Sequence, residues 1–255
     1  MTKPAVSIVM SCYNETKNLE RGVLQEIEGF FKTQNYDWEV VITDDISTDS
    51  SLNLLQKFAK SHPNFHIYKL NQKGGKPGGI WNSIQHASYP IVLMTDIDQS
   101  TPISEITKLY PFFDQGYDVV IGSRGIGREG NSFLRKIGGP IFLTLRRLVL
   151  LRNIVDTQCG FKMLRLKTAK NLFPNLEVFK NMIQHPGWRV TAFDVELLFM
   201  AQKRGYKIKE VVVDWRNEDT SDTKGDSVKR YQKESVQMIQ EIIRVKKNDL
   251  RGLYD

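Results

Sequence analysis

The stretch Ile91-Val92-Leu93-Met94-Thr95-Asp96-Ile97-Asp98 carries more information about the fold than any other part of the chain. The run from Pro90 to Thr95 has the length and apolar composition of a buried parallel strand. Alternate residues of an extended chain point the same way, so the carboxylates of Asp96 and Asp98 can converge on one cation. Oxygen ligands of this kind suit Mg²⁺ or Mn²⁺. A strand that ends in a solvated acidic turn has the same pattern, so both interpretations stay open at this point.

Strands and helices alternate around this stretch. Short apolar runs predict strands, and apolar residues at helical spacing predict helices. The expected strands cover residues 6–11, 38–43, 65–69, 90–95 and 119–122, and the expected helices cover residues 18–33, 50–60, 76–87 and 102–113. Alternation at these spacings predicts an α/β fold whose mostly parallel, Rossmann-like sheet is flanked by helices.

Polar residues follow three of these strands at equivalent ends. They are Asn14 and Glu15 after the first strand, Asp44 and Asp45 after the second, and Asp96 and Asp98 after the fourth. Ligands of parallel sheets bind at the carboxyl ends of the strands. The sequence therefore predicts one site that collects these side chains.

The pattern changes after about residue 125, although no second fold is indicated. Residues 125–131 form a glycine-rich loop with one arginine, and residues 137–155 are apolar but interrupted by Arg146, Arg147 and Arg152. Strands are expected at residues 161–164 and 207–215, and helices at residues 193–204 and 228–245. We expect a single domain over residues 1–255.

Composition restricts the partners and the compartment. The net charge of +7 favours phosphate-rich ligands, anionic membranes or nucleic acid, but no nucleic-acid-binding motif is present, so that partner is not expected. Neither a signal peptide nor a membrane-spanning run is evident in the sequence. Cys12 and Cys159 suggest neither a disulfide framework nor a zinc site. These features predict a cytoplasmic protein.

Several motifs together resemble family 2 glycosyltransferases with the GT-A fold. The general ones are Val6-Ser7-Ile8-Val9, Tyr13-Asn14-Glu15, Val40-Val41-Ile42-Thr43-Asp44-Asp45 and Asp96-Ile97-Asp98. The specific ones are Asp156-Thr157-Gln158-Cys159-Gly160-Phe161-Lys162 and Phe193-Asp194-Val195-Glu196-Leu197-Leu198. The whole series is similar to the polyprenyl-phosphate sugar synthases, and to the dolichyl-phosphate β-glucosyltransferases most of all. The likeness covers nearly the whole chain.

The resemblance implies a reaction. In this reaction a hexose is transferred from a nucleotide sugar to a polyprenyl or dolichyl phosphate, with inversion and with the help of a metal. The expected hexose is glucose, and the expected donor is UDP-glucose. Residues 1–124 would bind the nucleotide sugar and residues 125–255 the lipid-phosphate acceptor. A hydroxyl of a glycan or glycolipid as acceptor, with Asp194 as base, is the alternative, and a non-catalytic nucleotide-sugar-binding module is an alternative of another class.

The resemblance also assigns roles to residues. Asp98 would bind the Mg²⁺ or Mn²⁺ directly, and Asp96 would bind the metal or the donor ribose. Asp45, with Asp44 as the other candidate, would accept a hydrogen bond from the base. The remaining donor contacts are expected from Tyr13, Asn14, Glu15, Lys73 and Lys76. Arg124 and Arg135 would hold the acceptor phosphate, and Asp194 would act as a base or orient Arg135 or the sugar.

Each role has a structural alternative. Asp44 or Asp45 could cap the helix that begins near Asp49, Asp194 could cap its own helix, and Arg124 could close a surface salt bridge. The lysines of the glycine-rich loop at residues 71–79 could be solvated. The sequence also departs from the family at Ile46, which stands at a position where a glycine is usual.

The arginine-bearing segment at residues 137–155 raises a question of location. It is too charged to span a bilayer, but helices of this composition can lie in the membrane interface. We expect peripheral binding through this segment at the cytoplasmic face of a membrane. The alternative is that its apolar side chains pack against the sheet.

Overall fold

The computed structural model describes residues 3–125, 151, 154–181, 193–216 and 227–254, with the backbone alone for residues 180–181 and 227–238. Arg135 and all but the last few residues of the predicted interfacial segment lie outside these ranges. Within the described residues no helix is long and apolar enough to cross a membrane.

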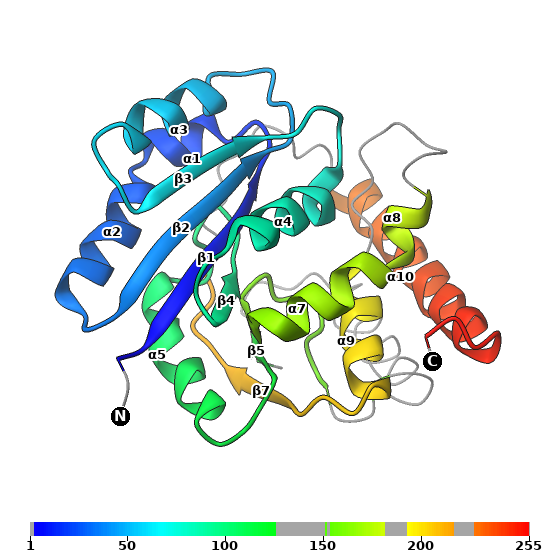
Figure 1. Ribbon diagram of the computed structural model, residues 1–255. Helices are drawn as coiled ribbons and strands as arrows, with labels where there is room; N and C mark the ends of the chain where they lie inside the picture. The colour runs from blue at the N-terminus through cyan, green and yellow to red at the C-terminus, as the bar shows by residue number, and fades with distance from the viewer. Residues whose placement is uncertain (1–2, 126–150, 152–153, 182–192, 217–226, 255) are drawn as a thin grey trace.

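One seven-stranded sheet forms the centre of the molecule (Figure 1). Its order is β3-β2-β1-β4-β6-β5-β7, with β1 at Ala5–Cys12, β2 at Asp37–Asp44, β3 at Phe65–Lys69, β4 at Ile91–Met94, β5 at Val119–Ser123, β6 at Lys162–Arg165 and β7 at Ile208–Val212. All neighbours pair in parallel except β6, which is antiparallel to β4 and β5. The α/β class and the mostly parallel sheet predicted from the sequence are confirmed.

The reversed strand β6 matters for the site. Because β6 runs against its neighbours, its first residue, Lys162, lies beside Met94 at the carboxyl end of β4. Residues 156–161 lead into β6 and therefore reach the edge of the sheet where a parallel α/β fold collects its ligands.

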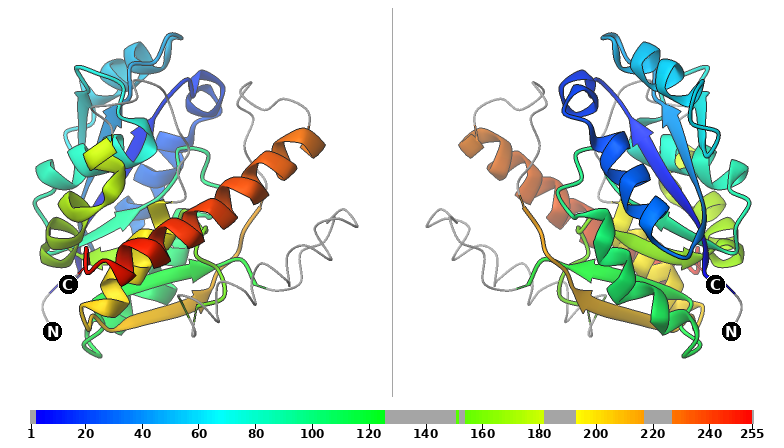
Figure 2. Two further views of the ribbon diagram at one scale, coloured as in Figure 1. Left: turned by 90° about the vertical axis from the view of Figure 1, so that its right-hand side faces the viewer. Right: turned by 90° about the vertical axis from the view of Figure 1, so that its left-hand side faces the viewer.

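Helices cover both faces of the sheet (Figures 1 and 2). The first face carries α1 at Thr16–Glu20, α2 at Val23–Thr33, α3 at Ser51–Ala59 and α5 at Ile106–Leu109. The second face carries α4 at Gly75–His86, α7 at Leu166–Leu172 and α9 at Phe193–Lys203, and α10 at Ser227–Leu250 packs on α9. A short helix, α8 at Glu177–Asn181, follows α7.

The strands are buried on both sides by these two layers. In β1, Val6, Ile8 and Met10 face the first layer and Val9 faces the second. Such two-sided burial explains why the strands read as continuous apolar runs and not as alternating ones.

Two predicted helices differ from the structure, and one helix was not predicted. The helix expected at residues 18–33 is broken at Gly22, which has a φ of 95° and is the N-cap of α2. In place of the helix expected at residues 102–113, the structure has the short α5 between two 3₁₀ turns, Ile103–Glu105 and Tyr110–Phe113. Pro111 is the second residue of the latter turn. The helix α7 was not predicted, because only seven residues separate the end of β6 from the following 3₁₀ turn.

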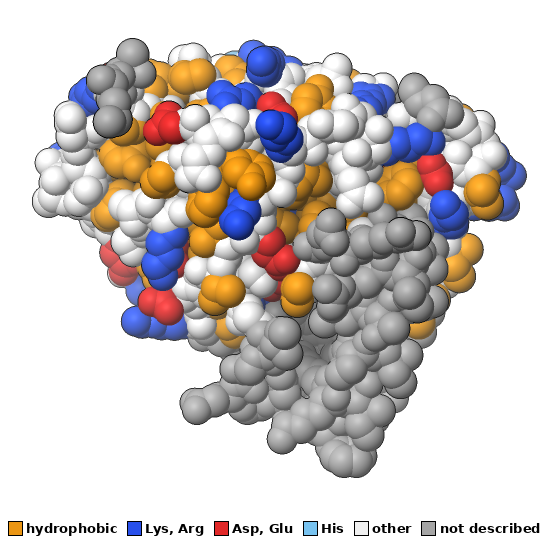
Figure 3. All heavy atoms as spheres, turned by 90° about the horizontal axis from the view of Figure 1, so that it is seen from below, with side chains coloured by type: hydrophobic (Ala, Val, Ile, Leu, Met, Phe, Trp, Pro, Cys, Tyr) orange, Lys and Arg blue, Asp and Glu red, His pale blue; other side chains and the backbone are white. Residues whose placement is uncertain are grey.

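On the face of the molecule seen from below, lysine and arginine side chains of the described residues are interspersed with acidic, apolar and uncharged ones (Figure 3).

Ile46 is held in an unfavourable backbone conformation. Its φ is 58°, in the left-handed region that β-branched residues rarely adopt. The turn begins at Asp44, whose Oδ2 accepts a hydrogen bond from the N–H of Ser47 at 3.1 Å. Ile46 is thus strained in this turn.

Relieving this strain should stabilise the fold. We expect Ile46→Asn to raise the free energy of unfolding by about 1 kcal/mol, since asparagine tolerates the left-handed region better than a β-branched residue does. Ile46→Val keeps the branch and should stay within about 0.5 kcal/mol of the parent or fall below it. Urea unfolding at equilibrium measures both, and an equal or larger gain for the valine variant would contradict the strain.

Candidate active site

Asp44 and Asp45 are fully buried at the end of β2. Asp45 Oδ1 accepts a hydrogen bond from the N–H of Gly74 at 2.6 Å, whereas its Oδ2 has no hydrogen-bond partner among the described residues. Burial raises the pKa of Asp45, and the N–H groups of Gly74 and Gly75 oppose this rise. A buried carboxylate oxygen without a donor is a costly arrangement that a ligand N–H would relieve.

Neither aspartate caps the following helix. Asp49 serves that turn, since its Oδ1 accepts from the N–H of Ser51 at 3.0 Å and its Oδ2 from the N–H of Thr16 at 3.2 Å. The capping alternative for Asp44 and Asp45 is therefore wrong.

The end of β1 is ordered by contacts to the same turn. Asn14 has a φ of 55°, and its Oδ1 accepts from the N–H of Thr48 at 2.9 Å. The N–H of Glu15 donates to Ser51 Oγ at 2.7 Å, and Glu15 Oε2 accepts from Asn18 Nδ2 at 2.6 Å. These contacts fix the backbone between β1 and α1 close to Asp44.

The glycine-rich loop packs on the end of β1. Lys73 Nζ lies 3.4 Å from the centre of the Tyr13 ring. A Cβ at Gly79 would lie 2.2 Å from Ser11 Oγ, so only glycine lets α4 cross β1 this closely. Lys73 is thus a partly buried cation beside an aromatic face, and the solvated-lysine alternative does not describe it.

The D-x-D residues form the centre of the site. Asp96 Oδ1 pairs with Lys76 Nζ at 2.5 Å, with side-chain exposures of 42% and 32%. Asp98 Oδ1 accepts from the N–H of Ser100 at 2.9 Å, and the Asp98 carbonyl accepts from Arg21 Nη2 at 2.5 Å. Burial alone would lower the pKa of Lys76, but the carboxylates of Asp96, Asp194 and Asp98 raise it above its usual value.

The donor set suits a hard divalent cation, although it is incomplete without a ligand. Asp96 and Asp98 are both partly exposed, and Mg²⁺ is typically bound by one or two carboxylates together with waters and substrate phosphates. Among the residues that the structure describes, no three histidine, cysteine, aspartate or glutamate side chains are grouped to hold a metal. A cation here would compete with Lys76 for Asp96.

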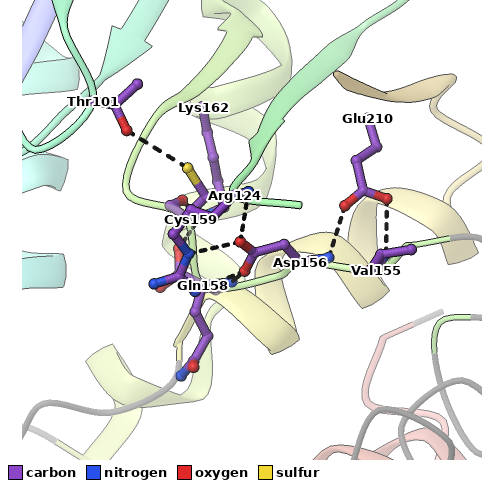
Figure 4. A network of polar contacts seen from close by, with 9 residues as sticks. Thr101, Arg124, Val155, Asp156, Gln158, Cys159, Lys162 and Glu210 are labelled. Atoms are coloured by element: carbon purple, nitrogen blue, oxygen red, sulfur yellow. Dashed lines mark hydrogen bonds and ion pairs between the residues drawn. The ribbon is translucent and has the colours of Figure 1, made fainter. Parts of the chain in front are cut away.

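A network around residues 156–162 holds this edge together (Figure 4). Asp156 accepts from Arg124 Nε at 2.7 Å, from Arg124 Nη2 at 2.8 Å and from the Arg124 N–H at 3.0 Å. Burial would raise the pKa of Asp156, but the hydrogen bonds and charge of Arg124 lower it well below its usual range. Glu210 on β7 accepts from the N–H groups of Val155 and Asp156 at 2.8 and 2.7 Å. Arg124 is therefore 17% exposed and committed to a buried partner, not to a surface salt bridge.

Lys162 is a site residue that the sequence analysis missed. Its side chain is fully buried, and its Nζ donates to Asp194 Oδ1 at 2.7 Å and to the carbonyl of Cys159. The sequence feature that could have identified it is a lysine at the start of an otherwise apolar strand, because a buried charged residue needs a partner. Asp194 stands in the first turn of α9, where a carboxylate also interacts favourably with the helix dipole.

Gly160 brings the same loop against Asp96. A Cβ at this position would lie 2.1 Å from Asp96 Oδ2. The neighbouring Cys159 is 1% exposed, and burial raises the pKa of its thiol, so it is a packed residue and not a nucleophile. The structure thus groups two lysines and three aspartates of the site, namely Lys76, Lys162, Asp96, Asp98 and Asp194. Arg135 lies outside the described residues.

The described end of the predicted interfacial segment belongs to the core. Leu151 is fully buried and Ile154 is 3% exposed, both within the cluster that α4, α7 and α9 form. For these two residues the packed alternative is correct.

Comparisons with known proteins place the chain among glycosyltransferases. A family model described as Glycosyl transferase family 2 matches residues 7–173. The protein named Dolichyl-phosphate beta-glucosyltransferase ALG5D of Trichomonas vaginalis is 31% identical over 86% of this chain and 68% of its own length. The Dolichyl-phosphate beta-glucosyltransferase of Dictyostelium discoideum is 29% identical over 98% of this chain and 76% of its own length.

A solved structure shares the fold. Glucosyl-3-phosphoglycerate synthase from Mycobacterium tuberculosis, in complex with Mn²⁺, UDP-glucose and phosphoglyceric acid, has a TM-score of 0.64. It is 15% identical, and the match covers 96% of this chain and 80% of that one. At this identity the likeness concerns the fold alone.

The close approach of Gly160 to Asp96 can be tested by adding a methyl group. We expect Gly160→Ala to lower the free energy of unfolding by about 1–3 kcal/mol, since the Cβ forces Asp96 or the loop to move. Gly29→Ala in α2 is the matched control: nothing lies within 4 Å of its Cβ, so it should gain about 0.5–1 kcal/mol. Equal stability of the two variants in denaturant unfolding would refute the contact.

Proposed function

The chain belongs to glycosyl transferase family 2, and we propose that it transfers glucose from UDP-glucose to a polyprenyl or dolichyl phosphate with inversion at the anomeric carbon. It is a glycosyltransferase with the GT-A fold, as the sequence predicted. The donor and the acceptor are our proposal, supported by the names of relatives at about 30% identity. The structural observation that supports it best is the grouping of Asp96, Asp98 and Asp194 with Lys76 and Lys162.

The donor nucleotide is proposed to lie across the ends of β1 and β2. Asp45 Oδ2 supports this placement, because the N3–H of uracil is a donor that this buried oxygen lacks. Asp44 and the ordered turn of Asn14 and Glu15 would shape the base and ribose site. Tyr13 and Lys73 would meet the ribose and the diphosphate.

A divalent cation is part of the proposal. Asp98, with Asp96, would hold Mg²⁺ or Mn²⁺, which would supply charge compensation for the departing diphosphate. Lys76 would then be released from Asp96 toward the diphosphate, where a second positive charge stabilises the same leaving group.

The acceptor is proposed to be a phosphate, for which the site needs no base. A phosphate oxygen is already anionic at neutral pH, so it can attack the anomeric carbon while the bond to the leaving UDP breaks, and no proton is moved. A hydroxyl acceptor needs a base that takes its proton. Asp194 Oδ1 already accepts a hydrogen bond from the buried ammonium of Lys162 at 2.7 Å, so this oxygen has a partner within the fold.

Arg124 is proposed to contact the acceptor phosphate while it holds Asp156. Asp156 engages Nε and Nη2 of the guanidinium, which leaves the Nη1 hydrogens to bind a phosphate. Arg135 is proposed to add a second positive charge. Apart from Arg124, residues 1–124 would serve the donor, and residues 125–255 would serve the acceptor, within one domain working at the cytoplasmic face of a membrane.

Nucleotide selectivity tests the donor. With Mn²⁺ present, UDP at about 100 times its Kd should stabilise the protein by about 2.7 kcal/mol, and GDP at the same concentration should stabilise it less. Thermal unfolding measures both. In Asp98→Ala the stabilisation by UDP should no longer depend on Mn²⁺, whereas a larger effect of GDP in the parent would exclude a uridine donor.

Isosteric amide variants test the acceptor class. With polyprenyl phosphate in detergent we expect Asp194→Asn to reduce kcat of the folded enzyme by less than about tenfold, because no base is needed. The variant removes the anion beside the buried ammonium of Lys162, so its free energy of unfolding should fall, and kcat is measured at a temperature where circular dichroism shows the variant folded. Asp98→Asn in the same cleft should reduce kcat about 100-fold or more, since it removes charge from the proposed metal ligand. A loss of that size for Asp194→Asn would favour the hydroxyl-acceptor alternative.

A further inference from the structure

The outer face of α10 carries an apolar stripe exposed to solvent. Ile239, Ile243, Leu250 and, in the turn that follows the helix, Leu253 are 42%, 60%, 78% and 51% exposed. At about 100° per residue the three helical members fall within roughly 40° of one another. We call these four residues the outer stripe. In the left view of Figure 2, α10 lies along the outside of the molecule, in front of α9.

The opposite face of α10 already anchors the helix. Ile242 and Val245 are buried in the core, and Arg244 pairs with Glu177 at 2.6 Å and with the fully buried Glu196 at 2.9 Å. Tyr254 OH donates to Glu196 Oε1 at 2.8 Å. The fold therefore holds α10 without using the outer stripe, and its four side chains are available to a partner.

The charges around the outer stripe are positive. Lys247 and Arg251 are exposed, and Lys246 is 40% exposed beside the stripe. The two carboxylates whose side chains the structure describes on this segment are each 16% exposed and paired, Glu241 with Arg244 and Asp249 with Lys203 and Lys246. The hydrogen bonds from Lys203 and Lys246 lower the pKa of Asp249, so it remains an anion bound to its lysines.

We propose that the outer stripe, with Lys246, Lys247 and Arg251, docks this protein on an anionic lipid surface. A convex helix face with an apolar line and basic flanks has the geometry of an interfacial helix. If two copies of the protein paired through this face, the cations of one copy would lie close to those of the other, and their repulsion disfavours such a dimer. The inference rests on the proposed function in one respect, since a lipid-phosphate acceptor gives the enzyme a reason to be at a bilayer.

Vesicle co-sedimentation tests the surface with the full chain. The parent should sediment with vesicles of phosphatidylcholine and phosphatidylglycerol, less with phosphatidylcholine alone, and less as salt increases. Ile243→Gln combined with Leu250→Gln should lower the partition on the order of tenfold, and Lys247→Gln combined with Arg251→Gln should abolish the preference for anionic vesicles. Val212→Gln is the matched control, because Val212 on β7 is 68% exposed and lies outside α10.

Two outcomes would overturn the proposal. The first is an apolar double variant that sediments like the parent. The second is a concentration-dependent dimer, seen by light scattering, that the same double variant dissociates, since the stripe would then bind a second copy.

Turnover separates this proposal from the proposed function. The apolar double variant should keep parental turnover of polyprenyl phosphate in detergent and lose it on vesicles; loss in both would contradict a docking role. If the parent turns over no phosphate acceptor but its vesicle binding responds as expected, the acceptor assignment fails and the docking surface stands.

Discussion

The buried ion pair between Lys162 and Asp194 joins β6 to α9 at the edge of the sheet where the candidate site lies. A lysine with a fully buried side chain is tolerated only with a close anionic partner and further acceptors, which here are Asp194 and the carbonyl of Cys159. Losing either partner would leave a buried charge uncompensated. The pair therefore ties the position of the reversed strand to the position of the helix, and the loop before Lys162 follows from both.

The loop at residues 156–161 sets the geometry of the site through close contacts along its length. Asp156 takes up the guanidinium of Arg124, and Gly160 allows the backbone to pass directly beside Asp96. Glu210 fixes the start of the loop from β7 through two backbone N–H groups. Three strands and one helix thus hold the loop, so the D-x-D carboxylates stand in a preorganised setting, as stabilisation of a charged leaving group requires.

The charges of the site are balanced in a way that suits the proposed chemistry. Three carboxylates, those of Asp96, Asp98 and Asp194, lie near two lysines. One of these lysines, Lys76, pairs with Asp96 at the place where a metal and a diphosphate are proposed to bind. The surplus of negative charge favours a cation, and the metal would in turn release Lys76 to the phosphates. At α10, by contrast, the carboxylates whose side chains are described are paired with lysine or arginine, and the exposed charges are basic.

The sequence by itself determined the α/β class, the two-sided burial of the strands and the placement of Asp45, Asp96 and Asp98 at one edge, because these depend on local periodicity and on the common direction of parallel strands. Only the tertiary structure decided that β6 runs backwards and that Lys162 meets Asp194. Lys162 and Asp194 are 32 positions apart, and β6 pairs with a strand still farther away in the sequence, so no local pattern encodes either pairing. The break at Gly22 was likewise not predicted, since backbone conformation at a single residue is set by the packing on either side. Ile46 was noted in the sequence as standing where glycine is usual, and the structure shows its φ of 58°.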